Sequence, residues 1–222
     1  MLPTPEFMIK RILPDSSTSQ MRQVFSYVNL LRLYGERVNL VSQADLSRLW
    51  ENHIYPSVIA LRLLEIPQQA RLIDVGSGGG LPAIPLKIMR PDLAIVLVES
   101  SRKKSAFLKK VIQEIDLPGI QVLNTRLFPE DQKFPHQNTF EVMTARALAT
   151  LEELIPMAQM LLKPTGFLLA WKGETDLLEM KSAASHGTFD YLEYQVPVEF
   201  YPISEKFSSL RLLKIWFENR QE

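Results

Sequence analysis

The chain has no cysteine among its 222 residues. This absence excludes disulfides, thiolate metal sites and every mechanism that needs a cysteine nucleophile, and it suits a reducing cytoplasm. The three histidines, His53, His136 and His186, lack the spacing of metal ligands, so we expect no metal site. No run approaches about 18 apolar residues, and the first residues lack the basic and apolar regions of a secretory signal. We therefore expect a cytoplasmic protein that does not cross a membrane.

An excess of charge of either sign is also lacking, since 25 Lys and Arg balance 25 Asp and Glu. A neutral chain has no strong overall field for nucleic acid, although a local patch can still bind it. With 46% hydrophobic residues the chain can bury one sizeable core, which predicts one domain or one domain with an appendage. We expect a monomer.

Glycine is scarce except at one place, where four of the nine glycines fall between Gly76 and Gly80. The preceding run, Leu72–Val75, is apolar and predicts a buried strand. Glycine allows positive φ and lets a ligand approach the backbone, so the cluster indicates a cofactor loop rather than a plain tight turn. A second apolar strand, Ala94–Glu99, ends in an acid about 20 residues beyond the glycines, where a ribose-binding carboxylate is expected.

Strands and helices alternate after Pro67. This alternation predicts an α/β fold with a mainly parallel, Rossmann-like sheet, helices on both faces and an antiparallel C-terminal edge. The expected strands are 72–75, 94–99, 120–124, 140–145, 166–171, 191–196 and 211–217, and the expected helices are 84–89, 103–115, 151–162 and 174–185.

Before Pro67 the pattern predicts helices. We expect a loose leader over residues 1–18, a helix over 21–33, and a second helical segment over 45–64 that is bent or interrupted at Pro56. The predicted organisation is a leader and helical extension over 1–66 and one main domain over 67–222, and we expect this domain to form one compact unit.

Open α/β sheets bind ligands at the carboxyl ends of their strands, which identifies the candidate site. Asp74 beside the glycine loop would repel a pyrophosphate but suits a ligand with an ammonium and a sulfonium, which favours S-adenosylmethionine over a dinucleotide. No Gly-Lys-Ser/Thr follows the glycines, so a nucleoside triphosphate loop is excluded. The candidate cofactor-binding residues are Asp74, Gly76, Gly78, Gly80, Leu81, Glu99, Leu127, Phe128 and Arg146.

Two cations follow neighbouring strands, Arg146 after 140–145 and Lys172 after 166–171. They are the candidate catalytic residues, because cations at adjacent strand ends could hold a phosphate or a guanine O6. The alternative is a structural ion pair, for example with Glu174. His53 is interpreted as a packing residue rather than a catalyst.

A basic patch lies on the helix expected over 103–115. Its cations point away from the apolar stripe that includes Phe107 and Val111, which fits either a solvated face or a track for RNA phosphates. The candidate RNA-binding residues here are Arg102, Lys103, Lys109, Lys110 and, beyond the helix, Arg126.

Several ordered motifs resemble the small-subunit ribosomal RNA methyltransferase G family, also called glucose-inhibited division protein B. They are the segments 74–86, 99–108, Arg126, 145–148 and 171–173, with an amino-terminal block at 27–31, 39–42 and 53–57. The resemblance implies a class I methyltransferase fold and methyl transfer from S-adenosylmethionine to N7 of a guanine in small-subunit (16S) ribosomal RNA. It also implies RNA binding by an arginine before the last strand, matched by Arg211 with a shift of one residue.

The chain departs from the family pattern at Ala83, Phe128 and Pro56, where glycine, an acidic residue and aspartate are usual. The residue chemistry still suits guanine N7, which carries a lone pair and no proton, so catalysis needs only two reactants in line about 3 Å apart. There is no thiolate for pyrimidine C5 and no Pro-Pro loop for amino groups. The alternatives are another RNA position, such as a ribose hydroxyl with Lys172 as base, a nicotinamide-dependent oxidoreductase, or a nucleic-acid-binding module without activity.

Overall fold

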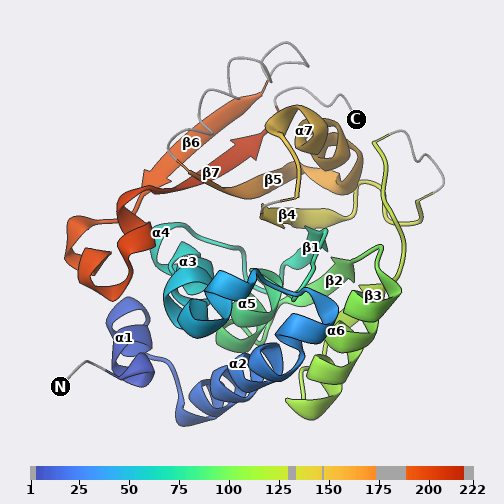
Figure 1. The fold of residues 1–222 in the computed structure, drawn as a ribbon. Helices are drawn as coiled ribbons and strands as arrows, with labels where there is room; N and C mark the ends of the chain where they lie inside the picture. The colour runs from blue at the N-terminus through green and yellow to red at the C-terminus, as the bar shows by residue number, and fades with distance from the viewer. Residues whose placement is uncertain (1–3, 130–133, 147, 174–188, 218–222) are drawn as a thin grey trace.

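The structure is a computed structural model that describes residues 4–129, 134–146, 148–173 and 189–217. Within those ranges no helix is long and apolar enough to cross a membrane. A seven-stranded sheet in the order β3-β2-β1-β4-β5-β7-β6 forms the centre of the molecule (Figure 1). Its strands are β1 (Arg71–Val75), β2 (Ala94–Val98), β3 (Ile120–Leu123), β4 (Phe140–Arg146), β5 (Leu162–Gly173), β6 (Asp190–Gln195) and β7 (Leu210–Trp216).

Strands β1 to β5 are parallel to one another, and β7 pairs antiparallel with both β5 and β6. This confirms the predicted mainly parallel sheet with an antiparallel C-terminal edge. The carboxyl ends of β1, β2, β4 and β5 therefore meet at one edge, where the candidate residues were expected. Strand β5 begins at Leu162, four residues before the predicted start.

Helices cover both faces of the sheet, as predicted. Helices α2 (Thr18–Val38), α5 (Ala83–Met89) and α6 (Arg102–Glu114) lie on one face, and α7 (Leu151–Leu161) lies on the other (Figure 1). A large apolar cluster fills the first face and a smaller one, including Ile73, Val98 and Leu154, fills the second. The predicted helix over 174–185 lies outside the described residues.

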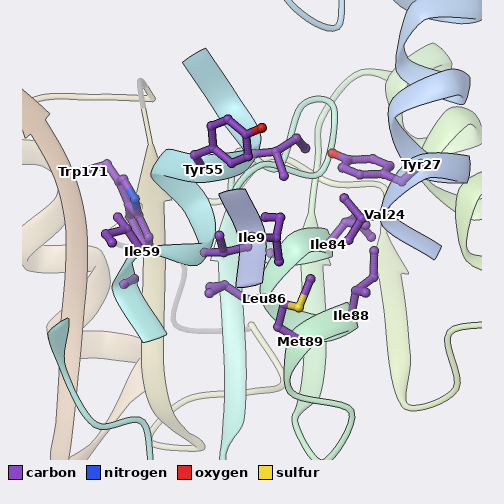
Figure 2. Packing of buried hydrophobic residues seen from close by; sticks show 14 of the residues in the cluster. Ile9, Val24, Tyr27, Tyr55, Ile59, Ile84, Leu86, Ile88, Met89 and Trp171 are labelled. Carbon is purple, nitrogen blue, oxygen red and sulfur yellow. The ribbon is translucent and has the colours of Figure 1, made fainter. Parts of the chain in front are cut away.

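The amino-terminal extension packs into the larger cluster and shares its core. Val24 and Tyr27 of α2 lie beside Ile84 of α5, and Ile9 belongs to the same cluster (Figure 2). The expectation of a loose leader was wrong, because residues 5–12 form helix α1 (Pro5–Ile12). Its signals were a Thr4 N-cap, a proline in the first turn and apolar residues spaced to bury one face.

The second predicted helical segment, 45–64, is broken into four short pieces. They are a 3-10 turn η1 (Gln43–Arg48), a π-helical turn η2 (Trp50–Ile54), and two short helices, α3 (Tyr55–Val58) and α4 (Ala60–Leu63). Near the C-terminus, two further 3-10 turns, η5 (Val198–Ile203) and η6 (Glu205–Ser208), precede β7. Ser204 donates a hydrogen bond to the Glu51 carbonyl at 2.7 Å, which ties this C-terminal segment to the extension.

Candidate active site

The glycine loop leaves β1 in a conformation that other residues rarely adopt. Gly76, Gly78 and Gly80 have φ angles of 71°, 53° and 93°. A Cβ on Gly76 would lie 2.4 Å from the Leu148 side chain, whereas a Cβ on Gly78 would meet only a backbone oxygen at 3.8 Å. The backbone is therefore open beside Gly78, where a ligand can approach it.

Glu99 holds this loop against the end of β2. One carboxylate oxygen accepts a hydrogen bond from the Gly78 N–H at 2.8 Å, and the other accepts one from the Ser101 N–H at 2.7 Å. Asn124 donates to the Glu99 carbonyl at 2.8 Å. Each carboxylate oxygen keeps a second lone pair, so Glu99 can shape the loop and still accept a hydrogen bond from a ligand.

Asp74 is buried at the base of the loop, with 1% of its surface exposed. Thr144 donates a hydrogen bond to its Oδ1 at 2.6 Å, while Oδ2 has no hydrogen-bond partner among the described residues. Burial raises the pKa of Asp74 to about 7, and the charge of Glu99 contributes to the rise. A cation placed near this carboxyl would stabilise its ionised form.

Tyr27 connects the extension to the loop, a contact that the sequence reasoning missed. It is fully buried, and its hydroxyl donates a hydrogen bond to the Gly79 carbonyl at 2.8 Å. Burial raises the pKa of Tyr27 well above its usual value, so the phenol remains a neutral donor. The spacing of apolar residues in α2 is consistent with Tyr27 on its buried face. Only the fold shows which residues that face contacts.

The segment after β3 carries two of the predicted cofactor-binding residues in different settings. Leu127 is buried in the smaller apolar cluster, whereas the Phe128 ring is 46% exposed. The exposed Arg126 guanidinium lies 5.4 Å from the centre of that ring. Leu81 is half-buried beyond the glycines. Phe128 therefore offers an accessible aromatic ring after β3, and Leu127 anchors the same segment in the smaller cluster.

Arg146 reaches from the end of β4 into the extension. Its guanidinium donates hydrogen bonds to the carbonyl oxygens of Asn52 at 2.6 Å and His53 at 3.3 Å. Both acceptors lie in the π-helical turn η2, a type of turn that often occurs at functional sites. Burial lowers the pKa of Arg146 to about 10, so the side chain stays charged at neutral pH. Arg146 thus joins the sheet edge to the extension.

A cavity of about 380 Å³ opens at the ends of β4 and β5. Arg146 and Lys172 line it from the sheet, Asp45, Asn52 and His53 from the extension, and Lys206 from η6. Lys172 donates a hydrogen bond to the Ala149 carbonyl at 3.3 Å, and the expected alternative partner, Glu174, lies outside the described residues. The structure thus brings both candidate catalytic residues to one cavity.

His53 lies on the wall of this cavity, which its interpretation as a packing residue did not anticipate. Its Nε2 is 3.4 Å from Asp45 Oδ2 and makes no hydrogen bond within the described residues. Burial, helped by the charge of Arg146, lowers the pKa of His53 to about 4. The imidazole is therefore neutral at pH 7.

A larger cavity, about 1520 Å³, lies at the opposite edge of the sheet. Its walls include residues 64–69, which precede β1, and Met89, Arg90 and Asp92, which precede β2. Ligands of open α/β sheets bind outside the carboxyl ends of the strands, so we assign the site to the smaller cavity and the glycine loop.

The predicted basic surface is exposed only in part. Arg102, Lys103 and Lys109 are exposed on α6, while Lys110 forms an ion pair with Glu114. Arg211 is buried, lies 3.2 Å from a Glu193 carboxylate oxygen and donates to the backbone carbonyls of Ser208 and Leu210. This geometry gives Arg211 a structural role, so we leave it out of the RNA surface proposed below.

Comparison with known proteins agrees with this geometry. A family model described as rRNA small subunit methyltransferase G matches residues 20–202. Two relatives carry the name ribosomal RNA small subunit methyltransferase G. The one from Moorella thermoacetica is 36% identical over 74% of this chain and 69% of its own. The one from Paracoccus denitrificans is 35% identical over 81% of this chain and 90% of its own.

Solved structures show the fold alone, at lower identity. A SAM-dependent methyltransferase from Aquifex aeolicus has a TM-score of 0.55 and 15% identity, covering 76% of this chain and 92% of its own. An O-methyltransferase described as predicted, from Agrobacterium tumefaciens, also has a TM-score of 0.55, with 16% identity, covering 75% and 80%. The fold is therefore the predicted class I S-adenosylmethionine-dependent methyltransferase fold, and the chain belongs to the rRNA small subunit methyltransferase G family.

Proposed function

We propose that the protein transfers a methyl group from S-adenosylmethionine to N7 of a guanine in small-subunit ribosomal RNA. The observation that carries this proposal is the family match over residues 20–202, which spans the glycine loop, Arg146 and Lys172. The protein would act in the cytoplasm as a monomer, with ribosomal RNA or the small ribosomal subunit as its partner.

The residues at the glycine loop fit the proposed cofactor. The Asp74 carboxyl, with one oxygen that lacks a partner among the described residues, suits a positively charged ligand. Glu99 can accept hydrogen bonds from ribose hydroxyls while it holds the Gly78 N–H, and the exposed Phe128 ring can contact the adenine. S-adenosylmethionine would supply an electrophilic methyl group on its sulfonium.

Methylation of guanine N7 requires little of the protein beyond positioning the base and the methyl donor in line. The N7 lone pair would form the new N–C bond with the methyl group that the sulfonium supplies, the S–C bonding electrons would stay on sulfur, and no proton would need to move. With a pKa of about 4 His53 is a weak base, and Arg146 stays charged, so neither is suited to remove a proton, which N7 methylation does not require. Arg146 and Lys172 would hold the guanine O6 or a neighbouring phosphate.

RNA would approach along the exposed cations of α6 and Arg126. Arg102, Lys103 and Lys109 lie on the helix that begins beside Glu99, and Arg126 follows the neighbouring strand. Phosphate contacts of this kind position RNA without reading its sequence, so the choice of guanine must come from the cavity.

Two measurements test the proposal. Calorimetry should show binding of S-adenosylmethionine and no binding of NAD, because the buried Asp74 opposes a pyrophosphate. Ribosomal RNA from cells that lack the gene should lose one N7-methylguanosine, and the gene should restore it. Binding of NAD would favour the oxidoreductase alternative, and loss of a methyl group elsewhere would favour another RNA position.

A further inference from the structure

Asp45 presents a carboxylate to the cavity at the ends of β4 and β5. Its position is fixed by two donors, the Ser42 hydroxyl at 2.6 Å from Oδ2 and the Asn52 side-chain amide at Oδ1. Burial alone would raise the pKa of Asp45, but these hydrogen bonds help to lower it below its usual value. The Asp45 side chain is 27% exposed. The carboxylate is therefore ionised, held in place and still accessible.

Two polar atoms beside Asp45 indicate that this wall binds a ligand. Asn52 Oδ1 and His53 Nε2 are buried and have no hydrogen-bond partner among the described residues. Buried polar groups without a partner are unfavourable, so hydrogen bonds to an incoming polar group would stabilise the bound state. Both residues line the same cavity as Asp45, and its volume suits a ligand of the size of one base.

We propose that Asp45 selects guanine by accepting hydrogen bonds from N1–H and the N2 amino group of its Watson–Crick edge. This inference rests on the proposed function. Enzymes that modify a base commonly read the extruded base along that edge. Guanine presents two donors there, whereas adenine presents the N1 acceptor, which an ionised carboxylate repels. The amino-terminal extension would thus supply the selectivity that the phosphate contacts lack.

The same contact would strengthen as the methyl group moves. Methylation at N7 places a positive charge on the base, which makes N1–H a stronger donor to Asp45. An interaction that is stronger in the transition state than in the ground state raises the rate of the chemical step. Arg146 and Lys172, in contrast, would oppose that charge unless a phosphate neutralises one of them.

The test compares guanine with inosine, which lacks only the 2-amino group, at the target position of an RNA substrate. The native enzyme should lose roughly 10- to 100-fold in kcat/KM on inosine, the value of one hydrogen bond to a charged acceptor. Asp45→Asn should lose a similar factor on guanine, and its guanine-to-inosine ratio should fall toward 1. Glu205→Gln removes a neighbouring charge that pairs with Arg48 and should leave the native ratio unchanged.

Equal rates on guanine and inosine in the native enzyme would overturn the inference, even if Asp45→Asn fails to fold. An unchanged ratio in a folded Asp45→Asn variant would overturn it too. If the native product is N7-methylguanine but the guanine-to-inosine ratio of kcat/KM is the same in the native enzyme and in Asp45→Asn, only the role of Asp45 fails. If the methyl group lies on another atom or base, the proposed function fails first.

Discussion

The Tyr27 hydroxyl donates a hydrogen bond to the Gly79 carbonyl at 2.8 Å, and this contact fixes the middle of the glycine loop to the amino-terminal extension. Tyr27 is fully buried, so no water can replace it as the donor. The extension is therefore part of the site, since it also supplies the acceptors for Arg146.

Tyr27→Phe should weaken S-adenosylmethionine binding and lower the free energy of unfolding by about 1–3 kcal/mol, because the Gly79 carbonyl loses its donor. Calorimetry and thermal unfolding measure the two effects. Tyr34→Phe is the control, since the Tyr34 ring lies near Phe107 and Lys110 rather than the loop. Native cofactor affinity in Tyr27→Phe would show that the loop does not depend on this contact.

The raised pKa of Asp74 predicts a pH dependence with a definite sign. In the folded protein its pKa is about 7, against an ordinary value of 3.8, so the native state holds a proton that the unfolded chain releases. The contribution of Asp74 to stability should therefore fall as pH rises from about 4 to 7. Asp74→Asn should remove this dependence.

The affinity for S-adenosylmethionine should change with pH in the opposite direction to the stability contribution of Asp74. A ligand with a sulfonium and an ammonium favours the ionised carboxyl, so S-adenosylmethionine affinity should increase between pH 6 and pH 8. S-adenosylhomocysteine keeps only the ammonium and should show a weaker dependence. A flat profile for S-adenosylmethionine would remove Asp74 from the cofactor site.

Arg146 should affect both activity and stability, because its guanidinium lines the cavity and also holds two backbone carbonyls of the extension. Arg146→Met leaves the carbonyls of Asn52 and His53 without their donor, so the melting temperature should fall. The pKa of His53, now about 4, should rise because a repelling charge is gone. NMR titration measures it, and an unchanged pKa in a folded variant would contradict the placement of Arg146.

Lys103 and Lys109 are better probes of RNA binding than Lys110, which is paired with Glu114. Replacing both with Gln should reduce the slope of log affinity against log salt by roughly 2 and leave S-adenosylmethionine affinity unchanged. Lys110→Gln alone should have a smaller effect. An unchanged slope in the double variant would move the RNA surface away from α6.

The sheet and the glycine loop were predictable because their signals are local. Leu72–Val75 followed by glycines, and Glu99 after the next strand, define one edge of a parallel sheet once the alternation of strands and helices is recognised. The broken segment 43–63 was not predictable in detail, since a π-helical turn depends on tertiary contacts such as those with Arg146. The cavity brings Asp45 and His53 together with Lys206, which is far from them in the chain and shares no motif with them.

Methyl transfer in a purified system tests the central proposal most directly. The protein, S-adenosylmethionine with a labelled methyl group, and small-subunit RNA or the small subunit from cells that lack the gene are combined, and the RNA is digested to nucleosides. The proposal predicts about one label per RNA molecule, recovered as N7-methylguanosine. A label on a ribose, on another base or on another atom of guanine, or no label from a protein that binds the cofactor, would contradict it.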